Sequence, residues 1–330
     1  MFAITLAAVV LPPAGEGPDI HSDSAEPLVR VGSTTPAPCV NDGTDGRRIL
    51  LVYARTSSDA HEYSSAAPAI RQMAGIVNAA MRTAGGKDVR WHCTSRGTVT
   101  VERVLVASHR LAACRSALQD AGHSRRDRLY ICFMPTSDDG FNGQAEIIHD
   151  ADAKVSPSPH DVGPRYASIY SLASSSAGGL MHELGHLLGA VQCSAPHTSC
   201  PGGERGHHHC YEEQDLMCLQ DGGSYYTQGG EIVDRCPNAS TLASRWDCGR
   251  DDYFNPDPAP GSYLATHWNT YDSLFLVNAG GEPDPEPSPT TAPSPTGNAS
   301  PSPTPTSTRK TKLDQRVRTV LRVSGADGRG

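Results

Sequence analysis

Ten cysteines constrain this chain of 330 residues more than any other feature of its sequence. A large, even number of cysteines is hard to keep reduced, so we expect disulfides and an oxidising compartment outside the cytoplasm. Six of the ten fall between residues 193 and 248, a stretch without hydrophobic periodicity. Short-range pairing is plausible there for Cys193–Cys200, Cys210–Cys218 and Cys236–Cys248, although spacing alone does not decide the connectivity. A structural zinc site is the rival interpretation, but the cysteine spacings of a zinc knuckle are absent.

The composition of the two ends predicts the domain organisation. Residues 1–14 contain an apolar run typical of a signal peptide, although no basic residues precede it. Residues 15–46 are rich in Pro, Gly, Ser and Thr and are interpreted as a linker or propeptide. Residues 281–308 form a Pro/Thr/Ser-rich linker. Residues 47–280 therefore remain for one folded domain.

The basic tail at residues 309–330 has two interpretations. We favour a solvated end of the chain, because runs of charge are usually disordered. The alternative is association with an anionic cell wall.

Charge and hydrophobicity exclude two classes of partner. The net charge of −8 argues against a protein that binds nucleic acid by general electrostatics. No apolar run reaches the ~18–20 residues that a transmembrane helix needs, so we expect no membrane-spanning segment. Together with the ten cysteines and the signal-like segment at residues 1–14, this predicts a secreted, extracellular protein.

Residues 48–188 alternate between strand and helix patterns. Residues 48–56 and 128–134 are continuous apolar runs typical of buried strands, and 98–107, 144–149 and 165–172 are further predicted strands. Helical periodicity is found at 66–84 and 111–121, and another helix starts near residue 177. This order predicts an α/β domain with a mixed sheet.

The segment His182-Glu183-Leu184-Gly185-His186 has the pattern H-E-x-x-H. Two histidines at i and i+4 lie on one face of a helix, so both imidazoles can bind one metal ion, usually zinc. The glutamate between them can take a proton from a zinc-bound water whose pKa the metal has lowered. Leucines around the motif give the helix an apolar face. We therefore predict His182 and His186 as metal ligands and Glu183 as the catalytic base.

Two further residues extend the motif. Gly189 follows at the spacing of H-E-x-x-H-x-x-G-x-x-H, and Met217 lies in Asp215-Leu216-Met217-Cys218, which looks like a Met-turn. With these motifs the chain resembles the metzincin clan of zinc endopeptidases, and more closely secreted actinobacterial metalloproteases, over about residues 47–279. The resemblance implies a twisted mixed sheet with an active-site helix, followed by an irregular, disulfide-rich C-terminal subdomain.

The third metal ligand departs from the metzincin pattern, because Gln192 stands where that pattern has His or Asp. A neutral carboxamide is a poor zinc ligand, so we expect another residue to complete the site. We choose His209, which precedes Cys210 and ends the G-H-C segment of the resembled family. Alternatives that stay open are His197, His207, His208 and Asp215, and an acidic ligand, Glu204 or Glu212, would indicate a different class of zinc peptidase.

The sequence thus predicts a secreted zinc metalloendopeptidase that hydrolyses polypeptides through a zinc-bound water activated by Glu183, with the substrate in a cleft between two subdomains. The alternative is a secreted zinc-binding or envelope-attachment module without catalysis, for which Gln192 and the basic tail are the only support. Cleavage specificity, the natural substrate, the propeptide boundary and the oligomeric state do not follow from the sequence.

Overall fold

A computed structural model describes residues 19–23, 39, 46–59, 63–149, 151–173 and 176–280. The predicted signal-like segment (1–14), the Pro/Thr/Ser-rich linker (281–308) and the basic tail (309–330) lie outside the described residues. Most of the predicted linker or propeptide (15–46) lies outside them as well.

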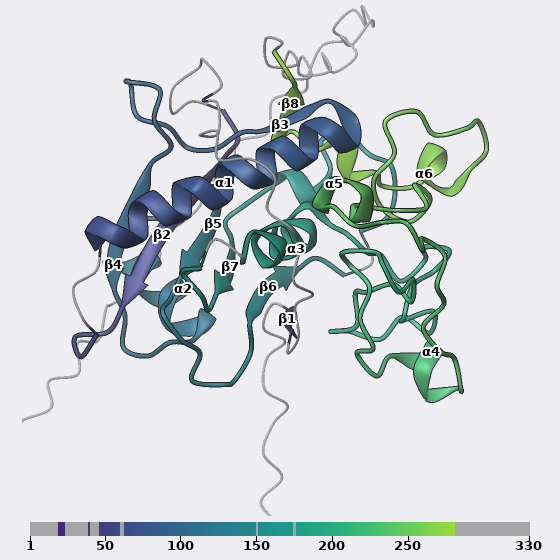
Figure 1. The fold of residues 1–330 in the computed structure, drawn as a ribbon, viewed down its shortest axis with the longest axis horizontal. Coiled ribbons are helices and arrows are strands. Elements are labelled where there is room, and N and C mark those ends of the chain that lie inside the picture. The colour runs from purple at the N-terminus through teal and green to yellow at the C-terminus, as the bar shows by residue number, and fades with distance from the viewer. Residues whose placement is uncertain are drawn as a thin grey trace, which may run out of the picture. The chain divides into compact units, whose positions relative to one another are not determined.

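Six strands in the described part of the chain form one mixed sheet, in the order β1-β6-β7-β5-β2-β4 (Figure 1). Their bounds are β1 (Asp19–Asp23), β2 (Arg48–Arg55), β4 (Val101–Leu105), β5 (Arg128–Phe133), β6 (Gly143–Ile147) and β7 (Arg165–Ile169). Strands β4, β2, β5 and β7 are parallel to one another. Strand β6 runs antiparallel to β7, and β1 runs antiparallel to β6 at one edge. The predicted mixed sheet is confirmed.

Strands β2 and β5 occupy the interior of the sheet because both of their faces are apolar. Every residue of β5 is buried, as is all of β2 except its last residue. A strand in a parallel sheet is covered on both faces, so it reads as a continuous apolar run rather than an alternating one. The sequence pattern of these two strands therefore also predicts their central position.

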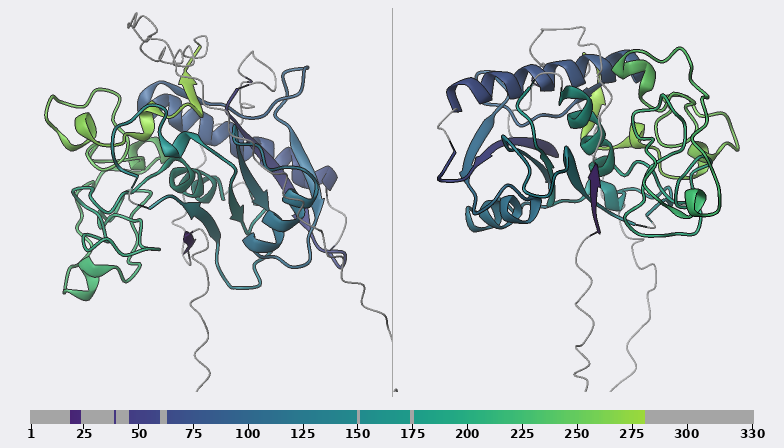
Figure 2. Two further views of the ribbon diagram at one scale, coloured as in Figure 1. Left: turned by 180° about the vertical axis from the view of Figure 1, so that it is seen from behind. Right: turned by 60° about the horizontal axis from the view of Figure 1, so that its bottom comes forward.

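Three long helices cover the sheet: α1 (Tyr63–Gly85), α2 (Leu111–Asp120) and α3 (Ala177–Leu188). Helices α1 and α3 pack on one face, and α2 packs on the other, as the right-hand view of Figure 2 shows. All three lie where the apolar periodicity predicts a helix.

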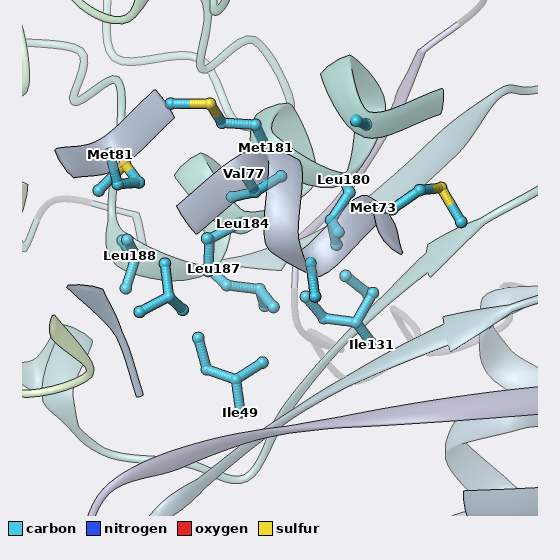
Figure 3. Close-up of a cluster of buried hydrophobic side chains, with 14 of the residues drawn as sticks. Ile49, Met73, Val77, Met81, Ile131, Leu180, Met181, Leu184, Leu187 and Leu188 are labelled. Carbon is cyan, nitrogen blue, oxygen red and sulfur yellow. The ribbon is translucent and has the colours of Figure 1, made fainter. Parts of the chain in front are cut away.

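Helix α3 is buried over its entire length, so the core surrounds the H-E-x-x-H segment. Leu180, Leu184 and Leu187 project among apolar side chains of α1 and of the central strands (Figure 3). Each of these three leucines is 0 % exposed. A helix packed on all sides has little freedom to shift, which holds the side chains of its motif in place.

Residues 189–280 contain little regular structure. Their elements are α4 (Ser224–Thr227), α5 (Leu242–Arg245), α6 (Tyr263–Thr266), the 3-10 helix η3 (Thr270–Asp272) and strand β8 (Leu276–Asn278). Strand β8 pairs with β3 (Lys87–Val89), and a further 3-10 helix, η1 (Pro159–Asp161), precedes β7. These loops lie beside the sheet domain in Figure 1, in green. The predicted irregular C-terminal part is confirmed.

All ten cysteines are paired. The three expected short-range disulfides are present, and the other two are Cys39–Cys93 and Cys114–Cys132. The Cys114–Cys132 bond joins α2 to β5, whereas the three short-range bonds stabilise loops that bury little apolar surface. Five disulfides indicate an oxidising compartment. In the described residues no helix is both long and apolar enough to cross a membrane.

Three strands were not predicted. Strands β3 and β8 have three residues each, too few for a periodic pattern. Strand β1 lies within the stretch that its composition marks as a linker or propeptide, and it pairs with β6 over five residues. Pairing with an existing sheet edge supplies the hydrogen bonds that such a segment lacks by itself.

Candidate metal centre

Helix α3 places His182 and His186 one turn apart on the same face. Their Nε2 atoms lie 3.0 Å apart, and the two rings are nearly perpendicular. His186 is 0 % exposed, whereas His182 is 8 % exposed. The predicted pair of imidazoles therefore faces one common point.

Helix α3 ends at Gly189, which lets the chain turn sharply away. Gly189 has φ +94°, a left-handed conformation that disfavours other residues. A Cβ atom there would also overlap the ring of His160. The turn thus requires glycine, as the spacing of the motif predicts, and it sends the chain toward residues 190–209.

His209 returns from that loop as a third imidazole. Its Nε2 lies 3.3 Å from Nε2 of His182, and its ring centroid is 5.1 Å from that of His186. His209 is 0 % exposed. The three histidines form a group whose ligand atoms all lie within 4.8 Å of one another.

The remaining nitrogen of each imidazole is held by an acceptor. Nδ1 of His182 donates to the Leu216 carbonyl (2.7 Å), and Nδ1 of His186 donates to the Ala190 carbonyl (3.1 Å). Nδ1 of His209 donates to Oδ2 of Asp221 at 3.0 Å. Burial raises the pKa of Asp221, but the hydrogen bond from His209, the charge of that imidazole and the hydrogen bonds from Gly223 and Ser199 together lower that pKa below its ordinary value.

These acceptors decide the tautomer of each neutral imidazole, that is, which of its two nitrogens carries the proton. A carbonyl or carboxylate oxygen cannot donate, so the proton of each neutral imidazole lies on Nδ1. The three Nε2 lone pairs then converge without a hydrogen between them. Such an arrangement is repulsive by itself and favourable around a cation. In a tetrahedral site with metal–nitrogen distances of ~2.0–2.1 Å, neighbouring ligand atoms are separated by about 3.3–3.4 Å. The observed separation of 3.3 Å between His182 and His209 matches that geometry, and the 3.0 Å between His182 and His186 is about 0.3 Å shorter.

Glu183 lies on α3 between the two histidines and is 1 % exposed. Its side chain lies against Gly143, the first residue of β6. A Cβ atom at Gly143 would come within 2.7 Å of Cδ of Glu183. Only glycine at this position leaves room for the carboxylate. Strand β6 and helix α3 can therefore approach closely at Gly143 and Glu183.

The loop around Met217 packs against helix α3, where a Cβ atom at Gly185 would come within 2.6 Å of the Met217 sulfur. Met217 is 0 % exposed, and its amide donates to Oδ1 of Asp215 at 2.7 Å. The Asp215 carboxyl also accepts from the Tyr253 hydroxyl (2.9 Å) and from the Cys248 amide (2.8 Å). Burial raises the pKa of Asp215 to about 7. Because Leu216 accepts from His182, this loop connects the C-terminal part to the helix.

The disulfide Cys210–Cys218 joins His209 to the same loop. The Cys210 amide donates to the Met217 carbonyl at 3.1 Å, which sets the two segments side by side. The structure therefore places His209 beside the methionine loop, as expected from its neighbour Cys210.

The other candidate ligands lie elsewhere. The Gln192 amide donates to the Gly189 carbonyl at 2.9 Å. His208 contacts His149, and His197 belongs to a separate group with Glu212, Asp251 and Asp252. Asp215 holds backbone amides, His207 approaches Asp221, and Glu204 is close to Ser224. None of them joins the group of three histidines.

Sequence reasoning missed the acceptors behind the imidazoles. Asp221 carries no recognisable motif, and the two carbonyl groups have no side-chain signature at all. It also missed the group around His197, because its four members come from three separate segments of the chain.

Comparisons with known proteins add little. No family model and no curated protein matches the chain. Among solved structures, metalloproteinase-II from Bacteroides fragilis aligns with 20 % identity and a TM-score of 0.26. The alignment covers 56 % of this chain and 49 % of that one, so this chain spans about half the length of that structure. A TM-score this low does not establish a shared fold.

Proposed function

We propose that this chain is a secreted zinc-dependent endopeptidase of metzincin-like architecture, with His182, His186 and His209 as zinc ligands and Glu183 as the catalytic base. One observation carries the proposal: three buried imidazoles whose Nδ1 atoms are all held by acceptors direct their Nε2 lone pairs at one point. An all-imidazole set fits zinc better than calcium or magnesium, which prefer oxygen ligands.

Zinc held by three imidazoles supplies Lewis acidity toward a peptide carbonyl and toward water. The side chains and carbonyls around the site supply proton transfer and hold the imidazoles in place. Glu183 takes a proton from the attacking water and passes it to the leaving amine. Asp221 and the carbonyls of Leu216 and Ala190 keep each Nε2 aimed at the metal.

We further propose that residues 15–46 act as a propeptide and residues 47–280 as the peptidase domain. Strand β1 supports this assignment, because its residues pair with β6, whose first residue, Gly143, contacts Glu183. A polypeptide substrate would bind at the group of three histidines. The basic tail at 309–330 remains outside this proposal.

The alternative function, a zinc-binding or envelope-attachment module without catalysis, rests on Gln192 and on the basic tail. His209 offers a third imidazole close to His182 and His186, which weighs against the first of these two grounds. We therefore favour the peptidase.

The test measures hydrolysis of an unfolded, fluorescently quenched protein by the purified chain, both at full length and starting at residue 39. We expect cleavage that a chelator abolishes and zinc restores. Glu183→Ala should lose a factor of ~10²–10⁴ in rate while it keeps its zinc, since it removes only the base. His182→Ala should lose the zinc as well. Glu213, an exposed glutamate outside the group of three histidines, offers a control, and Glu213→Ala should cleave normally.

Two results would contradict the proposal: wild-type cleavage by Glu183→Ala, or cleavage that persists without metal. Cleavage by the shortened chain alone would support the propeptide assignment. Zinc binding without cleavage by either form would favour the non-catalytic alternative.

A further inference from the structure

A second group of metal-binding side chains lies in the C-terminal loops. His197, Glu212, Asp251 and Asp252 each direct one ligand atom into a common space, and these atoms lie within 4.8 Å of one another. Three of the four residues are buried, and Asp251 is partly exposed. The group shares no residue with the three-histidine site.

The distances around His197 resemble the edges of a coordination tetrahedron. Its Nδ1 lies 3.1 Å from Oδ2 of Asp252, 3.5 Å from Oε1 of Glu212 and 3.6 Å from Oδ1 of Asp251. Zinc with bonds of ~2.0–2.2 Å to nitrogen and oxygen separates its ligand atoms by about 3.3–3.6 Å. The three distances from His197 therefore suit one shared ion, and all four ligand atoms lie within 4.8 Å of one another.

The carboxylate of Glu212 has no hydrogen-bond donor within the described part of the chain, although it is 1 % exposed. The sulfur atom of Cys248 lies 3.7 Å from Oε2, but it belongs to a disulfide and has no proton to donate. Oε1 has only ion-pair contacts, to Nε of Arg235 at 3.4 Å and to His197. A buried carboxylate without hydrogen bonds is costly, and a bound cation would remove that cost.

The group around His197 carries more negative than positive charge. Three carboxylates face one imidazole, and the nearest arginine, Arg235, has a side chain that is 48 % exposed. In addition, Oδ1 of Asp251 is a buried oxygen without a hydrogen-bond partner. The space between these oxygens therefore favours a divalent cation.

We propose that His197, Glu212, Asp251 and Asp252 form a second zinc site. One imidazole nitrogen with three carboxylate oxygens is a ligand set that zinc accepts, whereas calcium takes six to eight oxygens. His197 binds through Nδ1, the atom that faces all three carboxylates. The proposal is independent of the peptidase activity.

The second site joins three segments of the chain at one point. The Asp252 carboxylate already accepts from the His197 amide at 2.8 Å. Cys248, which precedes Asp251 and Asp252, donates its amide to Asp215 of the methionine loop. An ion at this point would therefore stabilise the methionine loop, whose Leu216 carbonyl accepts from His182.

The test counts zinc by elemental analysis in the full-length chain after loading and dialysis against metal-free buffer. We expect two ions per chain in the wild type and one in Glu212→Gln. Asp251→Asn should also retain one, and it perturbs the fold less because its side chain is 45 % exposed. The control Glu213→Gln, at the neighbouring exposed position, should keep two. The double variant His182→Ala, His186→Ala should keep one ion, at the second site.

Circular dichroism establishes that each variant is folded before its metal is counted. One zinc in the wild type that the double histidine variant loses, or two in folded Glu212→Gln and Asp251→Asn, would overturn the proposal and leave His197 as an imidazolium held by carboxylates. Calcium bound by this group in preference to zinc would overturn the choice of ion. A failed peptidase assay would not affect these counts, so the two proposals fail separately.

Discussion

Asp221→Asn tests whether the carboxylate behind His209 sets the affinity for metal. Asp221 is fully enclosed, its side chain being 4 % exposed. Oδ2 accepts from Nδ1 of His209 (3.0 Å) and from the Ser199 hydroxyl (2.7 Å), and Oδ1 accepts from the Gly223 amide (2.9 Å). The asparagine side chain has one oxygen and one NH2 group. The NH2 group must therefore point at one of the two donors, His209 Nδ1 or the Gly223 amide.

The expected loss follows from this conflict. If the amide oxygen faces His209, the Gly223 amide loses its acceptor; if it faces Gly223, the imidazole loses its own. The negative charge that makes the imidazole more basic is lost in both orientations. Changes of this kind behind a metal-bound histidine weaken affinity ~10–100-fold, or about 1.4–2.7 kcal/mol.

Zinc affinity is measured by competition with a chelating indicator, and thermal unfolding is measured in the metal-free protein. Ser199→Ala is the matched control, because it removes a hydrogen bond to the same carboxylate but keeps the charge and the contact with His209. We expect Ser199→Ala to stay within about threefold of the wild type. An Asp221→Asn protein with wild-type affinity but a lower unfolding temperature would refute the reasoning, because Asp221 would then stabilise only the fold.

Three further predictions concern the helix and its surroundings. Gly143→Ala should lower turnover ~100-fold with zinc content unchanged, because the new Cβ displaces the Glu183 carboxylate; normal turnover would contradict the contact. Leu184→Ala should lower the free energy of unfolding by ~2–5 kcal/mol in urea titrations, whereas the control Leu105→Ala, at a position 58 % exposed, should change it by less than ~0.5 kcal/mol. Burial and the charge of a nearby arginine lower the pKa of His160 from 6.5 to about 3. Protonation therefore favours the unfolded chain, and stability is lost as the pH falls from about 6.5 toward 3. Relative to the non-titrating variant His160→Gln, the wild type should lose about 2 kcal/mol between pH 8 and pH 5, and parallel curves would exclude this role.

The local elements of the sheet domain follow from the sequence. Strands β2 and β5 are apolar runs, and helices α1 and α3 show helical periodicity. Each pattern extends over consecutive residues of one element, so a short stretch of sequence is enough to recognise it. The i, i+4 spacing of His182 and His186 is likewise a property of one helix. Short loops between cysteines also made three of the disulfides plausible from spacing.

The third imidazole was decided only by the tertiary structure. His197, His207, His208 and His209 lie in loops without periodicity, and only the adjacent Cys210 and the G-H-C segment favoured His209 in the sequence. Their positions depend on the turn at Gly189 and on a disulfide. The same holds for Asp221, for the pairing of β1 with β6 and for the group around His197, whose members are brought together from distant segments. Sequence therefore determined the helix that carries His182 and His186, because helical geometry is local. The folded loops brought His209 and the acceptors of the three imidazoles to that helix, because these contacts join residues far apart in the chain.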